Sequence, residues 1–183
     1  GAPLMAARAA LRSGVGLVTL ALPARCYQKI PRGLLEVMYE PLPSGKTGRF
    51  SPSAAASLKD LVREKGCVAM GPGMGTVPGL RKMVSTLLAS GRSPVVLDAD
   101  ALTLVGRRTE ILKRDFPVIL TPHPGEMGRL TGKTAEKVQE DRLGSARTLA
   151  RESGVVVVLK GYRTLIMTPG GEYFVNPTGN PGM

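Results

Sequence analysis

The sequence has no tryptophan and is poor in aromatic residues, histidine and cysteine. Aromatic side chains make up 4% of the 183 residues, so the stacking platforms that bind single-stranded nucleic acids are not expected. The two cysteines, Cys26 and Cys67, fit no metal-binding spacing, and one histidine in the chain does not supply a zinc site. This cysteine usage is typical of a reducing compartment, and we predict a cytoplasmic protein.

Long apolar runs and blocks of like charge are also missing. No apolar segment approaches the roughly 20 residues of a membrane-spanning helix, and no segment has the pattern of a signal peptide. The formal charge is +11, but the 25 lysines and arginines are spread along the chain. We therefore expect neither a membrane nor a nucleic acid as partner, and a basic surface that favours small anions such as nucleotides.

What the sequence does contain is an alternation of short apolar strands and amphipathic helices, with a length of about one domain. The pattern predicts an α/β fold with a mainly parallel sheet, helices on both faces and an antiparallel hairpin at one edge. No boundary divides residues 1–183, and we expect a single domain. Strands are predicted at 15–22, 36–42, 67–70, 95–97, 118–120, 155–159, 163–167 and 172–175, and helices at 4–12, 53–65, 102–113 and 135–153, with one more beginning at Pro78.

Four of the predicted strands end in chemically unusual residues. The strands that close at Met70, Leu97, Leu120 and Leu159 are followed by Gly-Pro-Gly-Met-Gly, Asp-Ala-Asp, Thr-Pro-His-Pro-Gly-Glu and Lys-Gly. If these strands are parallel, the four clusters lie along one edge of the sheet, where ligands bind in open α/β folds. The sequence therefore predicts a binding site at this edge.

The glycine-rich turn after Met70 has two interpretations. Gly71, Gly73 and Gly75 would let backbone N–H groups approach a phosphate or ribose closely, or they could simply form a tight turn between strand and helix. Thr76 stands where the dinucleotide fingerprint needs its third glycine, and neither Gly-Lys-Thr of the chain completes a Walker motif. Both interpretations stay open on this segment alone.

The polar residues at the other strand ends also have two interpretations each. His123, the single histidine, could contact a ligand or cap the helix that follows it, and Glu126 could complement the dipole of that helix. Lys160 could neutralise phosphate charge. Asp98 and Asp100 form no obvious acid–base pair, and we predict that Asp100 caps the next helix.

Taken together, these motifs resemble those of the NAD(P)H-hydrate dehydratase family, whose fold is ribokinase-like. The resemblance is closest to the bacterial, ADP-coupled form and implies a three-layer α/β/α sandwich. Its segments follow the family order over nearly the whole chain: GAPLMAARAALRSGVGLVTLA, GPGMGT, VVLDADAL, ILTPHPGEMGRL, VVVVLKGYRTLI and NPTGNPGM.

The resemblance implies repair of NADHX and NADPHX, the hydrated and damaged nicotinamide cofactors. ADP or ATP, with Mg²⁺ through ligands that the motifs do not identify, would drive removal of water and leave NAD(P)H, AMP and phosphate. Phosphoryl transfer to the hydrate hydroxyl followed by elimination is the chemistry that a kinase-like fold suggests. We further expect a homo-oligomer.

The resemblance also assigns residues by motif. Contacts to the hydrated cofactor would come from Ala2, Gly75 and His123. Further candidates for the site are Gly73, Asp98, Glu126 and Asn180. The adenine nucleotide would be lined by Lys160, Gly161, Tyr162, Arg163 and Thr164.

The family's catalytic residue is expected outside this sequence. In the family, TGNPGM leads into a GGSGD-type segment whose Asp is the expected base, and a strand with a GS-x-x-Y turn precedes GAP. The present sequence runs from Gly1 to Met183. We therefore expect an incomplete copy of the domain, with no catalytic residue among these 183.

Two other functions stay open. A kinase of the thiazole or hydroxymethylpyrimidine type would share the fold, although the TPHPGE and LDADAL segments argue against it. A non-catalytic nucleotide-binding module is the second alternative, favoured by the missing Asp segment.

Overall fold

A six-stranded sheet forms the centre of the structure, a computed structural model that describes residues 1–30 and 35–179. The strand order is β3-β4-β5-β6-β7-β8. β3 to β6 are parallel, and β7 and β8 return antiparallel as an edge hairpin. The strands are β3 (Val68–Met70), β4 (Val95–Leu97), β5 (Val118–Leu120), β6 (Val156–Leu159), β7 (Thr164–Met167) and β8 (Tyr173–Asn176).

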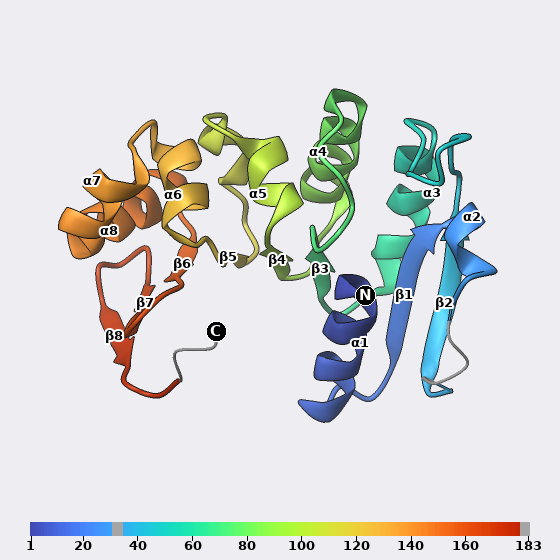
Figure 1. The fold of residues 1–183 in the computed structure, drawn as a ribbon, viewed down its shortest axis with the longest axis horizontal. Coiled ribbons are helices and arrows are strands. Elements are labelled where there is room, and N and C mark those ends of the chain that lie inside the picture. Colours follow the sequence, from blue (N-terminus) through green and yellow to red (C-terminus); the bar gives the residue numbers. More distant parts are fainter. Residues whose placement is uncertain (31–34, 180–183) are drawn as a thin grey trace.

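Helices cover the two sides of this sheet unequally (Figure 1). One side carries α4 (Arg81–Ser90), α5 (Asp100–Val105), α6 (Pro124–Thr131), α7 (Ala135–Glu140) and α8 (Arg142–Ser153). The helix α1 (Ala2–Arg12) lies on the other side. A separate parallel pair, β1 (Val18–Pro23) and β2 (Val37–Leu42), lies beside α1 and α3 (Ala54–Leu61). Short helical turns complete the order: α2 (Ala24–Tyr27), η1 (Val62–Glu64), η2 (Pro78–Leu80) and η3 (Thr109–Leu112).

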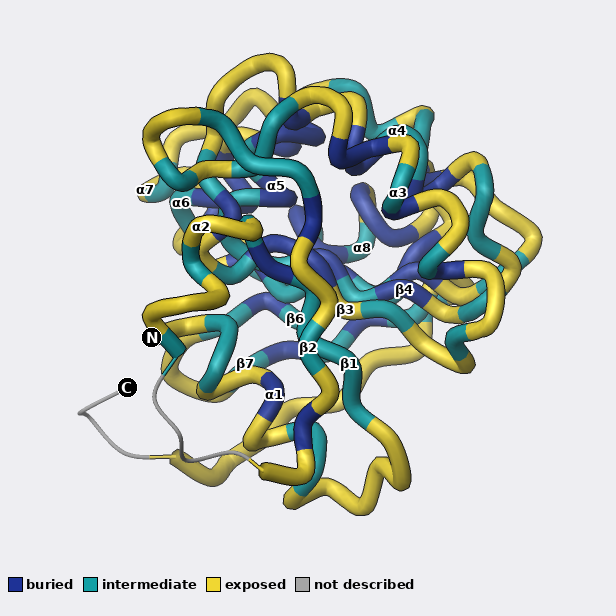
Figure 2. Tube along the Cα trace, turned by 90° about the vertical axis from the view of Figure 1, so that its right-hand side faces the viewer, coloured by how far each residue is buried: buried dark blue, intermediate teal, exposed yellow. Residues whose placement is uncertain are grey.

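The main core lies between the sheet and helices α3 to α8. Alternate strand residues such as Leu97, Leu120 and Leu159 are fully buried there, because successive side chains of a strand point to opposite faces. Their neighbours on the opposite face, including Ile119 and Val158, are only half-buried. Figure 2 shows the same asymmetry, with buried residues gathered among the strands and the upper helices and α1 mostly exposed.

The predicted fold is confirmed, and the parallel register aligns Met70 with Leu97 and Leu97 with Leu120. Leu120 pairs with Val157, so β6 ends near the same edge. The four strand ends with unusual residues therefore share one edge of the sheet, as expected.

Among the described residues, no helix is long and apolar enough to cross a membrane.

Three predicted elements differ from the structure. The helix predicted at 135–153 is broken at Asp141, whose side chain caps α8 by accepting from the N–H of Gly144. The helix predicted at 102–113 ends at Val105 because Gly106 takes a positive φ of 55°. The first predicted strand, 15–22, begins at Val18 and is half-buried rather than buried, with Leu22 its one buried residue.

Gly71 offers a direct test of how the ends of β3 and β4 fit together. It has a φ of +131°, and a Cβ at this position would overlap the carbonyl oxygen of Asp98. Gly71→Ala should therefore lower the free energy of unfolding by about 3 kcal/mol or more. Gly154→Ala is the control, since Gly154 also has a positive φ (+66°) but faces open space, and it should cost about 1 kcal/mol. Urea denaturation followed by circular dichroism measures both, and equal losses would contradict the packing argument.

Candidate functional site at the carboxyl edge of the sheet

Lys160 joins the ends of three neighbouring strands. Its ammonium lies 2.8 Å from Oδ1 of Asp98, which follows β4, and 3.8 Å from Oε2 of Glu126 in α6, which follows β5. Its backbone N–H donates to the carbonyl of Pro122 at 2.8 Å. Segments that are 62 residues apart in sequence thus meet through one side chain.

Asp98 is held in its charged form by this arrangement. Partial burial raises the pKa of Asp98, but hydrogen bonds from Lys160 and from Thr121 Oγ1 (2.7 Å), with the charge of Lys160, outweigh burial and lower the pKa below its ordinary value. Glu126 is 6% exposed, so its contact with Lys160 offsets the cost of burying a carboxylate. The site therefore contains two carboxylates and one shared ammonium.

His123 is the N-cap of α6 in a reciprocal capping box. Its Nδ1 accepts from the N–H groups of Gly125 (3.0 Å) and Glu126 (3.4 Å), and Glu126 Oε2 accepts from the N–H of His123 at 2.8 Å. The second ring nitrogen, Nε2, lies 3.5 Å from Glu126 Oε1, and the side chain is 51% exposed. The capping interpretation is confirmed, and the ring keeps an exposed edge for a ligand.

The glycine-rich turn after β3 is bound to the turn after β4. The N–H of Gly75 donates to Oδ2 of Asp100 at 2.8 Å. The prediction that Asp100 caps α5 is wrong, because that helix has no side-chain cap. The chain leaves the strand geometry at Ala99, which has φ 50° and ψ −117°, so Asp98 and Asp100 are not related as i and i+2 of a continuing strand, where they would share one face.

The amino end of α1 reaches the same turn. A Cβ added to Gly73 would lie 3.4 Å from Cδ of Pro3 and 3.9 Å from Cβ of Ala2. The structure thus places Ala2 next to the glycine-rich turn, as required if Ala2 and Gly75 contact one ligand.

The segment from Lys160 to Thr164 forms a tight turn between β6 and β7. Gly161 and Arg163 have positive φ values of 135° and 53°, and Thr164 Oγ1 donates to the Gly161 carbonyl at 3.0 Å. Tyr162 is 86% exposed, and the guanidinium carbon of Arg163 lies 5.3 Å from the centre of its ring. An exposed aromatic ring with one guanidinium beside it is suited to a planar, anionic ligand.

Comparison with known proteins places the sequence. The family model described as NAD(P)H-hydrate dehydratase matches residues 1–183. The chain belongs to this family. It is 45% identical over 184 aligned positions to a bifunctional NAD(P)H-hydrate repair enzyme of Moorella thermoacetica, covering 100% of this chain and 35% of that protein. It is 37% identical to an ADP-dependent (S)-NAD(P)H-hydrate dehydratase of Bacillus subtilis, covering 98% of this chain and 60% of the relative.

Solved structures agree with this assignment. An ADP/ATP-dependent NAD(P)H-hydrate dehydratase from Bacillus subtilis, co-crystallised with ATP and Mg²⁺, superimposes with a TM-score of 0.80 at 34% identity, covering 97% of this chain and 59% of that one. A ribokinase-like superfamily protein from Enterococcus faecalis has the same TM-score at 25% identity, covering 99% and 60%. The chain thus spans between about a third and three-fifths of the length of these relatives.

The residues proposed from the family motifs fall into three groups in the structure. Lys160 to Thr164 form one continuous turn, whereas Ala2, Gly73 and Gly75 gather at the amino end of α1. Asp98, Glu126 and His123 lie between them, joined through Lys160. Asn180 lies outside the described residues.

Two residues at this edge escaped the sequence analysis. Thr121 follows β5 and donates to Asp98, and Arg142 donates from α8 to the end of β6. The sequence offered one indication for Arg142: Asp141 is a favoured N-cap residue, so a new helix could have been predicted to begin at Arg142. Within the described ranges, no group of three or more His, Cys, Asp or Glu is arranged to hold a metal ion.

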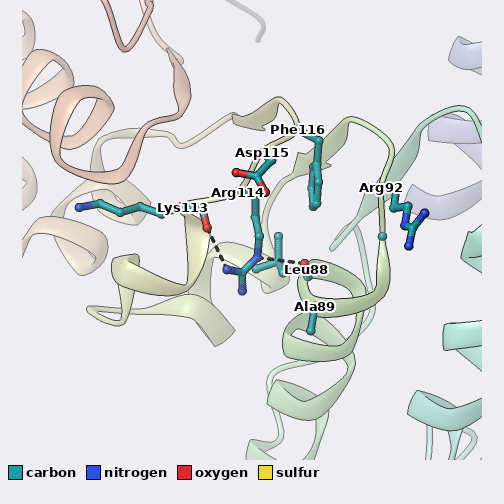
Figure 3. Close-up of a pocket in the computed structure, with 8 residues that line it drawn as sticks. Leu88, Ala89, Arg92, Lys113, Arg114, Asp115 and Phe116 are labelled. Carbon is teal, nitrogen blue, oxygen red and sulfur yellow. Dashed lines mark hydrogen bonds between the residues drawn. The ribbon is translucent and has the colours of Figure 1, made fainter.

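A hollow at the opposite edge of the sheet has a structural explanation. Figure 3 shows Arg114 at its centre, donating to the carbonyls of Leu88 (2.9 Å) and Lys113 (2.8 Å). The bond to Leu88 satisfies a carbonyl in the last turn of α4. Lys113 and Arg92 point away from each other, so the cations of this hollow do not converge on a ligand.

The lowered pKa of Asp98 makes its contribution to stability dependent on pH. A carboxyl with a lowered folded pKa stabilises the fold above its ordinary value of 3.8, and this is lost as the pH falls through the lower folded value. Asp98→Asn should therefore cost about 1 kcal/mol at pH 7, allowing for partial exposure. The gap to the unsubstituted protein should close as the pH falls below about 4. Denaturation at pH 7, 5 and 3 measures this, and a gap independent of pH would contradict it.

Proposed function

We propose that the chain takes part in the ADP-dependent dehydration of hydrated NADH and NADPH, returning NAD(P)H and yielding AMP and phosphate. The observation that carries the proposal is the position of Lys160, anchored between Asp98 and Glu126 at the start of the β6–β7 turn. Support comes from membership of the family and from the relatives of this chain that are named as dehydratases. One Bacillus subtilis relative is named ADP-dependent and a structural neighbour from the same organism ADP/ATP-dependent, so we propose ADP as the phosphate donor with ATP as the alternative.

The nucleotide would occupy the β6–β7 side of the edge. There the Lys160 ammonium would face its phosphates, and the exposed ring of Tyr162 offers a surface for the adenine. Arg163 adds a second positive charge in the same turn. Positioning and electrostatic stabilisation are the main contributions that proteins make to phosphoryl transfer, and this turn would supply both.

The hydrated nicotinamide would occupy the neighbouring side, near Ala2, Gly75 and His123. The Nδ1 atom of His123 is engaged in capping α6, so the Nε2 edge is the one left for a hydrogen bond to the hydrated ring. Gly75 is fixed by Asp100, which holds the glycine-rich turn against the ligand. In this proposal His123 orients the substrate and transfers no proton.

The described residues do not form a Mg²⁺ site of their own. The two carboxylates at the edge, Asp98 and Glu126, already share the ammonium of Lys160. Mg²⁺ is commonly bound through substrate phosphates and water with few protein ligands. We therefore propose no step through a protein-bound metal.

Lys160→Ala tests the nucleotide side. Loss of the ammonium should weaken ADP binding about tenfold or more, and the remaining binding should depend less on salt, because phosphate charge is no longer neutralised there. Lys160→Arg, which keeps the charge, should recover part of the affinity. Lys113→Ala is the matched control, since Lys113 is an exposed lysine at the opposite edge of the sheet. Titration calorimetry measures all four proteins, and ADP affinity unchanged in Lys160→Ala would reject this placement.

Substitutions of His123 separate its capping role from ligand binding. Asn can replace Nδ1 as an N-cap acceptor but has no counterpart to Nε2. Both His123→Ala and His123→Asn should weaken NADHX binding about tenfold with ADP affinity unchanged. A loss of stability of about 1 kcal/mol should appear in the alanine variant alone.

Binding and turnover of NADHX also distinguish the alternatives. If NADHX binding weakens in His123→Ala, which loses stability, but not in His123→Asn, which lacks only Nε2, then His123 has only its capping role. ADP binding without any NADHX binding would favour a nucleotide-binding module. ADP-dependent recovery of NADH absorbance from NADHX, measured on the chain extended through a GGSGD-type segment, would support the dehydratase.

A further inference from the structure

Arg142 stands at an unfavourable place in its own helix. The break at Asp141 makes Arg142 the first residue of α8, where the positive end of the helix dipole disfavours a cation. A residue that is locally unfavourable is usually explained by a contact that it makes elsewhere in the fold. The contacts of Arg142 show which part of the fold this is.

The guanidinium of Arg142 reaches across to the carboxyl end of β6. Its Nη2 donates to the carbonyl of Leu159 at 3.0 Å, and its Nη1 lies 3.4 Å from the carbonyl of Lys160. Nη1 also donates to Oε1 of Gln139 in α7 at 2.8 Å, which fixes the plane of the group. Burial lowers the pKa of Arg142, but arginine stays protonated in proteins.

The same guanidinium packs against Gly161. A Cβ at Gly161 would lie 3.0 Å from Nη1, and the φ of +135° at this residue also requires glycine. On its other side, the backbone of Lys160 donates to Pro122. The Lys160–Gly161 backbone is therefore held between the β5–α6 turn and the side chain of Arg142.

We propose that Arg142 is a positioning residue for the nucleotide turn, and this rests on the function proposed above. By fixing the carbonyls of Leu159 and Lys160, it sets the direction in which the Lys160 side chain and the Gly161 N–H meet the nucleotide phosphates. Its positive charge, close to the same turn, adds to the field of Lys160. Arg142 itself contacts the protein backbone and not the reacting atoms.

Arg142→Gln, which removes the charge and the fork of donors, is the principal variant. Arg142→Lys keeps the charge but loses the planar fork of donors. Its ADP affinity and its exchange rates should therefore lie between those of Arg142→Gln and of the unsubstituted protein. Arg151→Gln is the control, because Arg151 is an exposed arginine in the last turn of the same helix. The readouts are hydrogen exchange of the segment 159–165 without ligand, and the affinities for ADP and for NADHX.

In Arg142→Gln, amide exchange should accelerate in segment 159–165 but not in β4 or β5, and ADP should bind about tenfold more weakly. NADHX affinity should stay within about twofold, because the α1 side of the site makes no contact with Arg142. Arg151→Gln should match the unsubstituted protein in every readout. A purely structural role would instead raise exchange throughout the chain and weaken both ligands equally, and that result would overturn the proposal.

The two proposals fail in different ways. If the unsubstituted chain does not bind ADP, the proposed function is wrong, and exchange in segment 159–165 still decides whether Arg142 orders the turn. If ADP binds with equal affinity to Arg142→Gln and Arg151→Gln, with equal exchange, the role of Arg142 is wrong and the function stands.

Discussion

The ammonium of Lys160, placed between the carboxylates of Asp98 and Glu126, is the interaction on which the rest of the site depends. Glu126 is almost fully buried, and two carboxylates without a cation at this edge would repel each other and any phosphate. Lys160 removes that repulsion, and it also fixes the relative positions of the β4, β5 and β6 ends. Arg142 lies close to the same turn, and its charge and that of Lys160 balance the two carboxylates of Asp98 and Glu126. The affinity for an anion therefore has to come from the arrangement of these groups and from backbone N–H groups.

The parallel sheet makes this arrangement possible, since it brings the ends of four consecutive strands to one edge. Close approach of the loops then requires residues without a side chain or with a positive φ. Gly71 touches the Asp98 carbonyl, and Gly161 lies against Arg142. Ala99 takes a positive φ although it is not a glycine, and this sparsely populated conformation is what turns Asp100 toward the N–H of Gly75.

Local sequence patterns predicted the strands and their chemically unusual ends, because the apolar pattern of a buried strand can be recognised within a few consecutive residues. They could not predict which polar residues would pair. The contact of Asp98 with Lys160 joins residues 62 positions apart, and the roles of Asp100 and Arg142 follow from one positive φ at Ala99 and one helix break at Asp141. The apolar pattern at 135–153 is compatible with a continuous helix, but Asp141 caps a new helix whose first residue, Arg142, donates to the end of β6.

Structural and ligand-binding roles of these residues are compatible at the atomic level. His123 uses Nδ1 to cap α6, while its side chain is half exposed and its Nε2 lies 3.5 Å from Glu126 Oε1. Lys160 uses its backbone N–H to hold the strand end, while its side chain is 41% exposed. In each residue one atom fixes the geometry, while part of the side chain remains exposed. A side chain held in this way loses little conformational entropy when a ligand binds, so the contacts that stabilise the fold also favour binding.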